Sequence, residues 1–148
     1  MSRILTDLIF TCPTASLAKY LSSYEHTVYR YRYDAVFPSV SKYPNHGAYH
    51  TAEIPTVFGT YPLGKPSVPS TQQQIELSAL MQRTWAGFAK NPEAGVGWPV
   101  YKNYDFLDDL AVLGRGVSRG VEVVARVRAD YACPVYDPLG DLFELSYR

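Results

Sequence analysis

Hydrophobic positions along the first third of the chain change their spacing once. Over residues 4–24 they recur every three to four positions, which predicts a helix, with Thr6 as a cap and Pro13 as an interruption or a second start. From His26 to Ala35 the spacing becomes two, which predicts a strand. The tyrosines of the run Tyr29–Tyr33 would then lie on one face and its arginines on the other.

The middle of the chain combines a proline-rich segment with its clearest helix. Residues 36–69 contain six prolines, which predicts an ordered but irregular loop. Thr71 and Gln74 have the spacing of a capping box, and the helix that follows should end at Asn91-Pro92. One apolar stripe along this helix predicts its buried face and comprises Leu77, Met81, Thr84, Trp85 and Phe88.

Two further apolar runs, 107–113 and 121–127, predict strands joined by the glycine-rich segment Gly114–Gly120, and a turn is expected at Gly95–Pro99. Helices and strands thus alternate, which is typical of the α/β class. The composition fits one globular domain, with 47% hydrophobic and 19% charged residues over 148 residues.

The net charge and the length of the apolar runs argue against two kinds of partner, nucleic acids and membranes. The net charge is zero, and the tyrosines and arginines of residues 29–33 point in opposite directions, so we expect no nucleic-acid binding. No apolar run reaches the ~18 residues of a membrane span. The apolar run near the N-terminus is also shorter than a signal peptide requires, and the compartment stays undetermined.

Serine and histidine motifs offer only weak evidence of catalysis by themselves. Gly116–Gly120 matches the G-x-S-x-G nucleophile elbow with Ser118, but an elbow needs a helix after it, and the β-branched run that follows favours a hairpin turn. A triad of His50, Asp105 or Asp108, and Ser118 is nearly unconstrained by spacing. His46 and His50 lie in a loop without further ligand spacing, so we expect no metal and no cofactor. Exposed loop histidines are the plainer interpretation.

The segment Asn45–Gly59 changes this picture because it resembles the histidine region of type B carboxylesterases, the α/β-hydrolases that include lipases and cholinesterases. That family has a glycine, two further residues, the catalytic histidine, then an acidic residue and a Phe-Gly pair. The matching positions are Gly47, His50, Glu53, Phe58 and Gly59.

The resemblance extends over nearly the whole chain, 1–148, as a partial carboxylesterase type B domain from the C-terminal region, closest to fungal members. It includes the helix around Asp7–Pro13, the strand Tyr29–Tyr33, the helix Leu80–Ala89 and the Trp98-Pro99 turn. The implied fold is the C-terminal part of an α/β-hydrolase, its last sheet strands with packing helices. Sequence spacing leaves open whether Cys12 and Cys133 are buried thiols or a bridge, and the resemblance implies a disulfide.

The resemblance implies carboxylic-ester hydrolysis with His50 as the general base, while the serine, the triad acid and the oxyanion loop lie upstream of the matched region. Glu53 and Gly47 would support the histidine structurally. The chain alone should then be inactive, with a small ester as the substrate of the intact enzyme and an upstream N-terminal chain as a partner. Members of the family are often secreted. The alternative is a non-catalytic interaction module, or a relic, that binds a partner chain through an exposed sheet edge.

Overall fold

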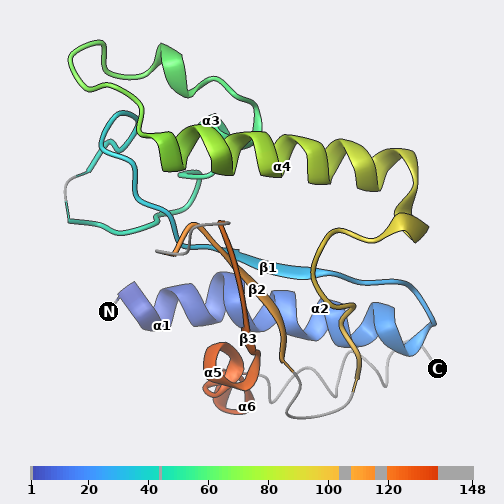
Figure 1. Cartoon of the computed structure of the whole chain (residues 1–148). Helices are drawn as coiled ribbons and strands as arrows, with labels where there is room; N and C mark the ends of the chain where they lie inside the picture. The colour runs from blue at the N-terminus through green and yellow to red at the C-terminus, as the bar shows by residue number, and fades with distance from the viewer. Residues whose placement is uncertain (1, 44, 104–107, 116–119, 137–148) are drawn as a thin grey trace. The chain divides into compact units, whose positions relative to one another are not determined.

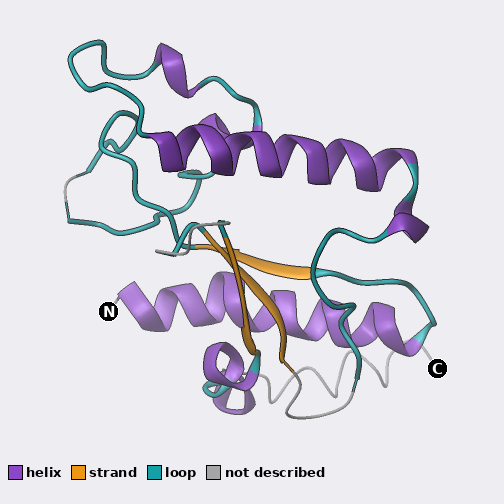
Figure 2. Ribbon diagram, in the orientation of Figure 1, coloured by secondary structure: helices purple, strands orange, loops and turns teal. Residues whose placement is uncertain are grey.

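The computed structural model describes residues 2–43, 45–103, 108–115 and 120–136. It is an α/β structure with one three-stranded sheet (Figures 1 and 2). The fold divides into two compact units. The first holds the described parts of Met1–Arg30, Pro99–Leu110 and Val124–Arg148, and the second those of Tyr31–Trp98 and Ala111–Val123.

A nearly continuous helical run begins the first unit. It consists of α1 (Ser2–Thr6), a π-helical turn η1 (Asp7–Thr11) and α2 (Cys12–Ser23). Pro13 lies in the first turn of α2, where its missing N–H costs least, so the expected second start is confirmed. The expected cap at Thr6 is wrong, because Thr6 has helical dihedral angles (φ −62°, ψ −46°) and lies inside the run.

The sheet has the order β1 (Arg30–Tyr33), β2 (Asp108–Leu113), β3 (Val121–Ala125). Asp34, just after β1, donates its N–H to the carbonyl of Leu113 at the end of β2 (2.8 Å). The last residues of β1 and β2 therefore lie side by side in the sheet. Gly114 donates to Gly120 (2.8 Å), which pairs the end of β2 with the start of β3. The two predicted C-terminal strands are confirmed as neighbours in the sheet, but β3 ends at Ala125, and Val127, the predicted last residue, begins the helix α5 (Val127–Asp130). Leu107 and residues 116–119 of the predicted turn lie outside the described residues.

The predicted strand His26–Ala35 is shorter in the structure, and one of its arginines is buried while a tyrosine of the opposite face is exposed. Arg30 is 6% exposed, whereas Tyr31 is 40% exposed. Arg30 is buried because Asp130 accepts two hydrogen bonds from its guanidinium, at 2.6 and 3.0 Å. A charge can leave water when it is paired in this way, and sequence alternation alone carries no information on a partner 100 residues away.

The long helix α4 (Gln72–Lys90) organises the second unit. The Thr71 side chain accepts the N–H of Gln74 at 3.1 Å, which confirms the cap at Thr71. The Gln74 side chain accepts from the Ser39 hydroxyl at 2.8 Å, so it does not complete the predicted capping box. The helix ends before Asn91, as expected. Leu77 and Met81 of the predicted stripe are fully buried, while Phe88 is 38% exposed. Short helical segments follow or precede α4: α3 (Ile54–Val57), η2 (Tyr61–Leu63) and η3 (Pro92–Ala94). The rest of the described 36–69 segment is the irregular loop that its prolines predict.

Gly114 lies at a closely packed point of the second unit. Its φ is +82°, and an added Cβ would lie 2.3 Å from the Ala35 Cβ and 2.9 Å from the Leu77 Cδ2. Gly114→Ala should therefore lower the free energy of unfolding by about 3 kcal/mol, through backbone strain and overpacking together. Gly97→Ala is the matched control, because Gly97 also has a positive φ (+90°) but nothing within 4 Å of the added Cβ. Equal losses for both variants in urea unfolding would contradict the packing argument.

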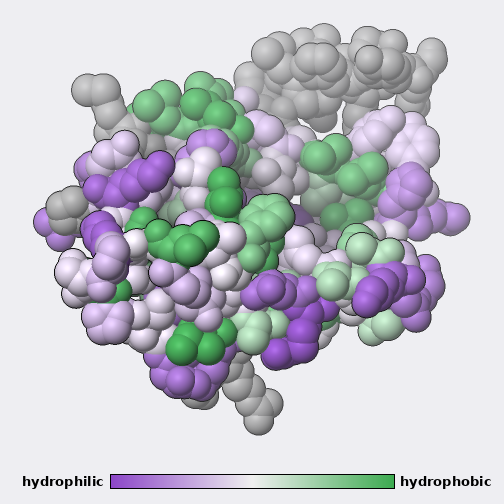
Figure 3. Space-filling view, turned by 90° about the horizontal axis from the view of Figure 1, so that it is seen from above, coloured by the Kyte–Doolittle hydropathy of each residue, from purple (hydrophilic) through white to green (hydrophobic). Residues whose placement is uncertain are grey.

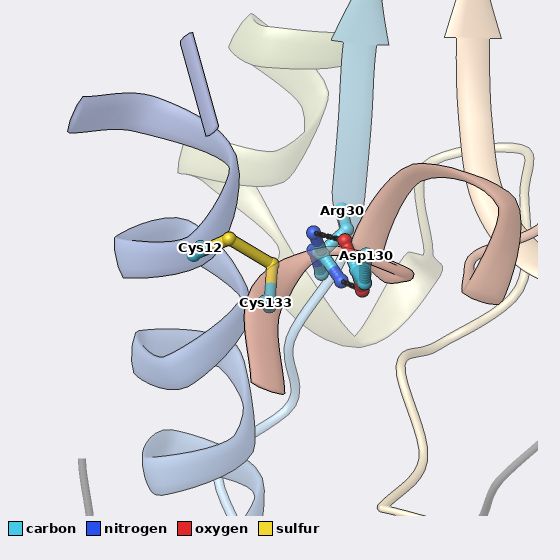
Figure 4. Close-up of a disulfide and its surroundings, with 4 residues drawn as sticks. All are labelled: Cys12, Arg30, Asp130 and Cys133. Atoms are coloured by element: carbon cyan, nitrogen blue, oxygen red, sulfur yellow. Dashed lines mark hydrogen bonds and ion pairs between the residues drawn. A yellow bond between two sulfur atoms is a disulfide. The ribbon is translucent and has the colours of Figure 1, made fainter. Parts of the chain in front are cut away.

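The disulfide Cys12–Cys133 closes the first unit (Figure 4). It joins α2 to α6 (Cys133–Tyr136), and the Arg30–Asp130 ion pair lies beside it, with Asp130 at the end of α5 (Val127–Asp130). The bridge spans 121 residues of sequence. The disulfide implied by the family resemblance is confirmed.

Candidate functional site

His50 lies on a turn in the second unit, immediately before α3, and is exposed. Ala52 donates its N–H to the carbonyl of Tyr49 (2.9 Å), and Ile54 donates to that of Thr51 (3.2 Å). Thr51, the next residue along the chain, has φ +78°, which is a strained conformation for a β-branched residue. Such strain concentrates at functional sites, where surrounding contacts hold it in place.

The turn is anchored through Thr56 of α3, which is completely buried. The Tyr33 hydroxyl on β1 and the Thr56 hydroxyl are hydrogen-bonded at 3.0 Å. Ser78 on α4 donates to the Thr56 carbonyl at 2.6 Å, and Gln82 donates to the Ser78 hydroxyl at 2.9 Å. The segment after His50 is therefore fixed to a strand on one side and to the long helix on the other.

The other predicted site residues belong to the same loop. Gly47 has φ +64°, the left-handed region that favours glycine, three residues before His50. Glu53 is half-buried at the start of α3. Burial chiefly raises the pKa of Tyr31, and the negative charge of Glu53 raises it further. Phe58 is 71% exposed at the end of this segment. Gly47, His50 and Glu53 thus lie on one short segment that ends at the start of α3.

Tyr33 links this turn to the sheet, and its pKa gives a test of the link. Burial raises the pKa of Tyr33 to about 12, the Thr56 hydrogen bond lowers it, and Glu53 raises it. The unfolded state therefore loses this proton first, near the ordinary tyrosine pKa of about 10, while the folded state keeps it. The resulting stability is complete below the unfolded pKa and is lost as pH rises through the folded pKa.

Accordingly, Tyr33→Phe should flatten the fall in unfolding free energy above pH 10, measured by urea unfolding at several pH values. Tyr24→Phe, at a tyrosine that is 62% exposed, provides the control. An unchanged alkaline slope in Tyr33→Phe would contradict the placement of this hydroxyl.

The remaining predictions from the sequence concern Ser118, a metal site and a membrane span. Ser118 lies outside the described residues, but Gly120 leads directly into the strand β3, whereas a nucleophile elbow needs a helix there. Among the described residues, no group of three or more histidine, cysteine, aspartate or glutamate side chains could hold a metal ion. Also within the described part, no helix is long and apolar enough to cross a membrane.

Sequence reasoning missed the residues that hold the histidine turn. Thr56 and Ser78 are small polar residues in apolar surroundings, and both are almost completely buried. The one available signal was position, because Ser78 follows Leu77 on the face of α4 that the apolar stripe predicts to be buried. Hydroxyls at such positions need a buried partner, and here each has one.

A separate cavity of about 560 Å³ lies in the first unit. Its size suits a small ligand, but its buried charged groups already serve the fold. Asp130 pairs with Arg30, and Arg126 pairs with Asp109 at 2.5 Å. Tyr101, also in its wall, lies under the guanidinium of Arg126 at 4.2 Å. These contacts make the cavity a weaker candidate than the histidine turn.

Comparison with known proteins shows to which family this chain belongs. The model of the carboxylesterase family matches residues 1–108. The chain belongs to the carboxylesterase family. A chlorogenic acid esterase of Aspergillus niger is 34% identical, with the match covering 87% of this chain and 28% of that protein. Secreted lipase 5 of Gibberella zeae is 38% identical over 60% of this chain and 16% of its own length. Acetylcholinesterase-1 of Trittame loki is 38% identical over 66% of this chain and 18% of its own length.

The carboxylesterase chain therefore spans less than a third of these curated relatives. The predicted relationship to type B carboxylesterases, with fungal relatives among the matches, is confirmed. The match to the family model contains the whole histidine turn, including Gly47, His50 and Glu53.

Proposed function

We propose that residues 1–148 form the C-terminal part of an α/β-hydrolase domain and supply the catalytic histidine, His50, of a carboxylic-ester hydrolase. The observation that carries the proposal is the anchored turn around His50, which lies inside the segment matched by the family model. An exposed imidazole on a turn with fixed flanks suits proton transfer to and from a group that approaches from outside this unit.

In the proposed reaction, the His50 imidazole takes the proton of a serine hydroxyl as its oxygen attacks the acyl carbon of the ester. The imidazolium then returns this proton to the departing alcohol, leaving an acyl-serine that water hydrolyses by the same two transfers. The serine, the triad acid and the oxyanion donors come from an upstream part of the family domain. Glu53 and Gly47 support the turn and are not themselves reacting groups.

It follows that this chain alone should show no esterase turnover above background, because the serine and the oxyanion donors supply most of the rate. The assay uses short p-nitrophenyl esters with the unmodified chain, His50→Ala and Ser118→Ala. His46→Ala is the control for the slow background hydrolysis that any exposed imidazole can promote. Turnover that both His50→Ala and Ser118→Ala abolish would overturn the proposal and restore the elbow at Ser118.

The partner in this proposal is an upstream carboxylesterase portion, and the apolar surface of the first unit supports it. Several large apolar side chains on α1 and η1 are about half exposed: Ile4, Leu5, Leu8, Ile9 and Phe10. In Figure 3 the hydrophobic residues on the visible face form separate patches between hydrophilic ones. Apolar area of this kind is stabilised when a partner covers it.

The rival function, a non-catalytic module that pairs through a sheet edge, makes a different prediction. β1 and β3 are the outer strands of the described sheet, and either edge can pair with another chain. An upstream reading frame that encodes a G-x-S-x-G followed by an acidic residue would favour the enzyme. A chain that elutes as a stable monomer in size-exclusion chromatography would count against the sheet-edge module.

A further inference from the structure

Three aromatic rings form a cluster on the loop that leads to His50. The rings of Tyr43 and His46 have centroids 5.2 Å apart, and those of Tyr43 and Tyr49 are 5.4 Å apart in an edge-to-face arrangement. Tyr49 directly precedes His50 in the sequence. None of the contacts that anchor the histidine turn to β1 and α4 uses these three residues.

The cluster is held in place while its rings remain accessible. Tyr43 is 51% exposed, His46 is exposed, and Tyr49 is half-buried. The Tyr49 hydroxyl accepts the N–H of Lys42 at 3.0 Å. Ser41 donates to the carbonyl of Tyr43 at 3.1 Å. Large rings that are exposed and yet fixed lose little conformational freedom when another ring packs on them.

The inner side of the cluster is closed to a ligand. A cavity of about 10 Å³ lies behind it, lined by Tyr33, Phe37, Gly47 and Tyr49 among others. This space suits about one water molecule and is far too small for a six-membered ring. A ligand ring must therefore lie on the outer side, against Tyr43 and His46.

The charges around the cluster favour an oxygen-rich ligand. The Lys65 ammonium donates to the carbonyl of Ser41, two residues before Tyr43, at 2.7 Å. This positive charge favours an electron-rich oxygen substituent, such as an acyl or carboxylate group, on a ring that stacks on the aromatic faces.

We propose that Tyr43, His46 and Tyr49 form a binding surface for the planar aromatic ring of an aromatic carboxylic ester or of its acid product. Because Tyr49 directly precedes His50, this surface would select among ester substrates for those with an aromatic ring. This part of the proposal rests on the proposed function. The binding itself depends only on the cluster.

Benzoate and cyclohexanecarboxylate provide the test, because they share a charge and nearly a size and differ in aromaticity. In NMR titrations of the full chain, benzoate should shift the ring signals of Tyr43, His46 and Tyr49 saturably. Its affinity should exceed that of cyclohexanecarboxylate by about threefold to tenfold. Equal shifts by both compounds, or shifts spread over unrelated tyrosines, would overturn the proposal.

Substitutions of Tyr43 test whether its ring causes the preference for benzoate. Tyr43→Leu keeps the size and removes the ring, so it should abolish the preference for benzoate, while Tyr43→Phe should keep it. Tyr24→Leu is the matched control, since Tyr24 contacts Tyr20 in an exposed ring pair elsewhere, with centroids 4.9 Å apart. A preference that survives Tyr43→Leu in a folded variant, checked by circular dichroism, would contradict the assignment.

This test separates the two proposals because it requires no turnover. Hydrolysis is measured after this chain is joined to an upstream carboxylesterase portion. In that protein, hydrolysis that does not depend on His50, combined with a benzoate preference at the cluster, would overturn the proposed function and leave the binding surface intact. His50-dependent hydrolysis combined with no benzoate preference would do the reverse.

Discussion

Reduction of the Cys12–Cys133 disulfide is expected to lower the free energy of unfolding by about 5 kcal/mol. The bridge joins residues 121 positions apart, and the loss of so long a loop constraint raises the entropy of the unfolded chain by that order in the chain-entropy model. The measurement is urea unfolding with and without a thiol reductant, together with peptide mapping to confirm the redox state.

The double variant Cys12→Ser, Cys133→Ser provides the control for this prediction. It should unfold as the reduced chain does and should not respond to the reductant. A reductant effect on the double variant, or a loss below about 1 kcal/mol in the unmodified chain, would contradict the role given to the bridge.

Breaking the buried ion pair between Asp109 and Arg126 is expected to have the second largest effect. Asp109 is 2% exposed, and its Oδ2 accepts from Arg126 at 2.5 Å. Arg126 also donates to the carbonyl of Lys102 at 2.6 Å. Burial raises the pKa of Asp109, and the Arg126 charge opposes that rise. Asp109→Asn should cost about 3–5 kcal/mol of unfolding free energy, because it leaves a buried guanidinium without its counter-charge.

Two comparisons locate the origin of this cost. The double variant Asp109→Leu, Arg126→Met removes both charges and should recover most of the loss. Arg115→Met removes an exposed partner of Asp34, at 2.6 Å, and should cost less than about 1 kcal/mol. A similar loss for Arg115→Met, or no recovery in the double variant, would contradict the account of a buried charge pair.

The sequence predicted correctly those helix starts and strands that depend on neighbouring residues alone. The Thr71 hydroxyl caps α4 because Gln74 is three residues away, and Pro13 starts α2 because it needs no hydrogen-bond acceptor. The β-branched run after Gly120 forms a strand, as its alternation predicts. Each of these outcomes depends on residues within one turn or one strand.

Distant partners explain what sequence alternation could not predict. Arg30 lies on the arginine face of the predicted strand and is nevertheless buried, because Asp130 and the Tyr101 ring lie against it. The histidine turn was located from a family motif, whereas Thr56 and Ser78, which hold it, have no motif of their own. Their roles follow from contacts between segments more than 20 residues apart, which alternation does not encode.

The measurement that tests the central claim most directly is the turnover of a chimera in which this chain replaces the corresponding part of the Aspergillus niger chlorogenic acid esterase. With His50 intact, the chimera should hydrolyse a p-nitrophenyl ester, and His50→Ala should lower kcat at least about a thousandfold. His26→Ala, at an exposed histidine outside this loop, should leave kcat within a few-fold of the parent. A chimera that folds and turns over equally well with His50→Ala would contradict the assignment of His50 as the catalytic histidine.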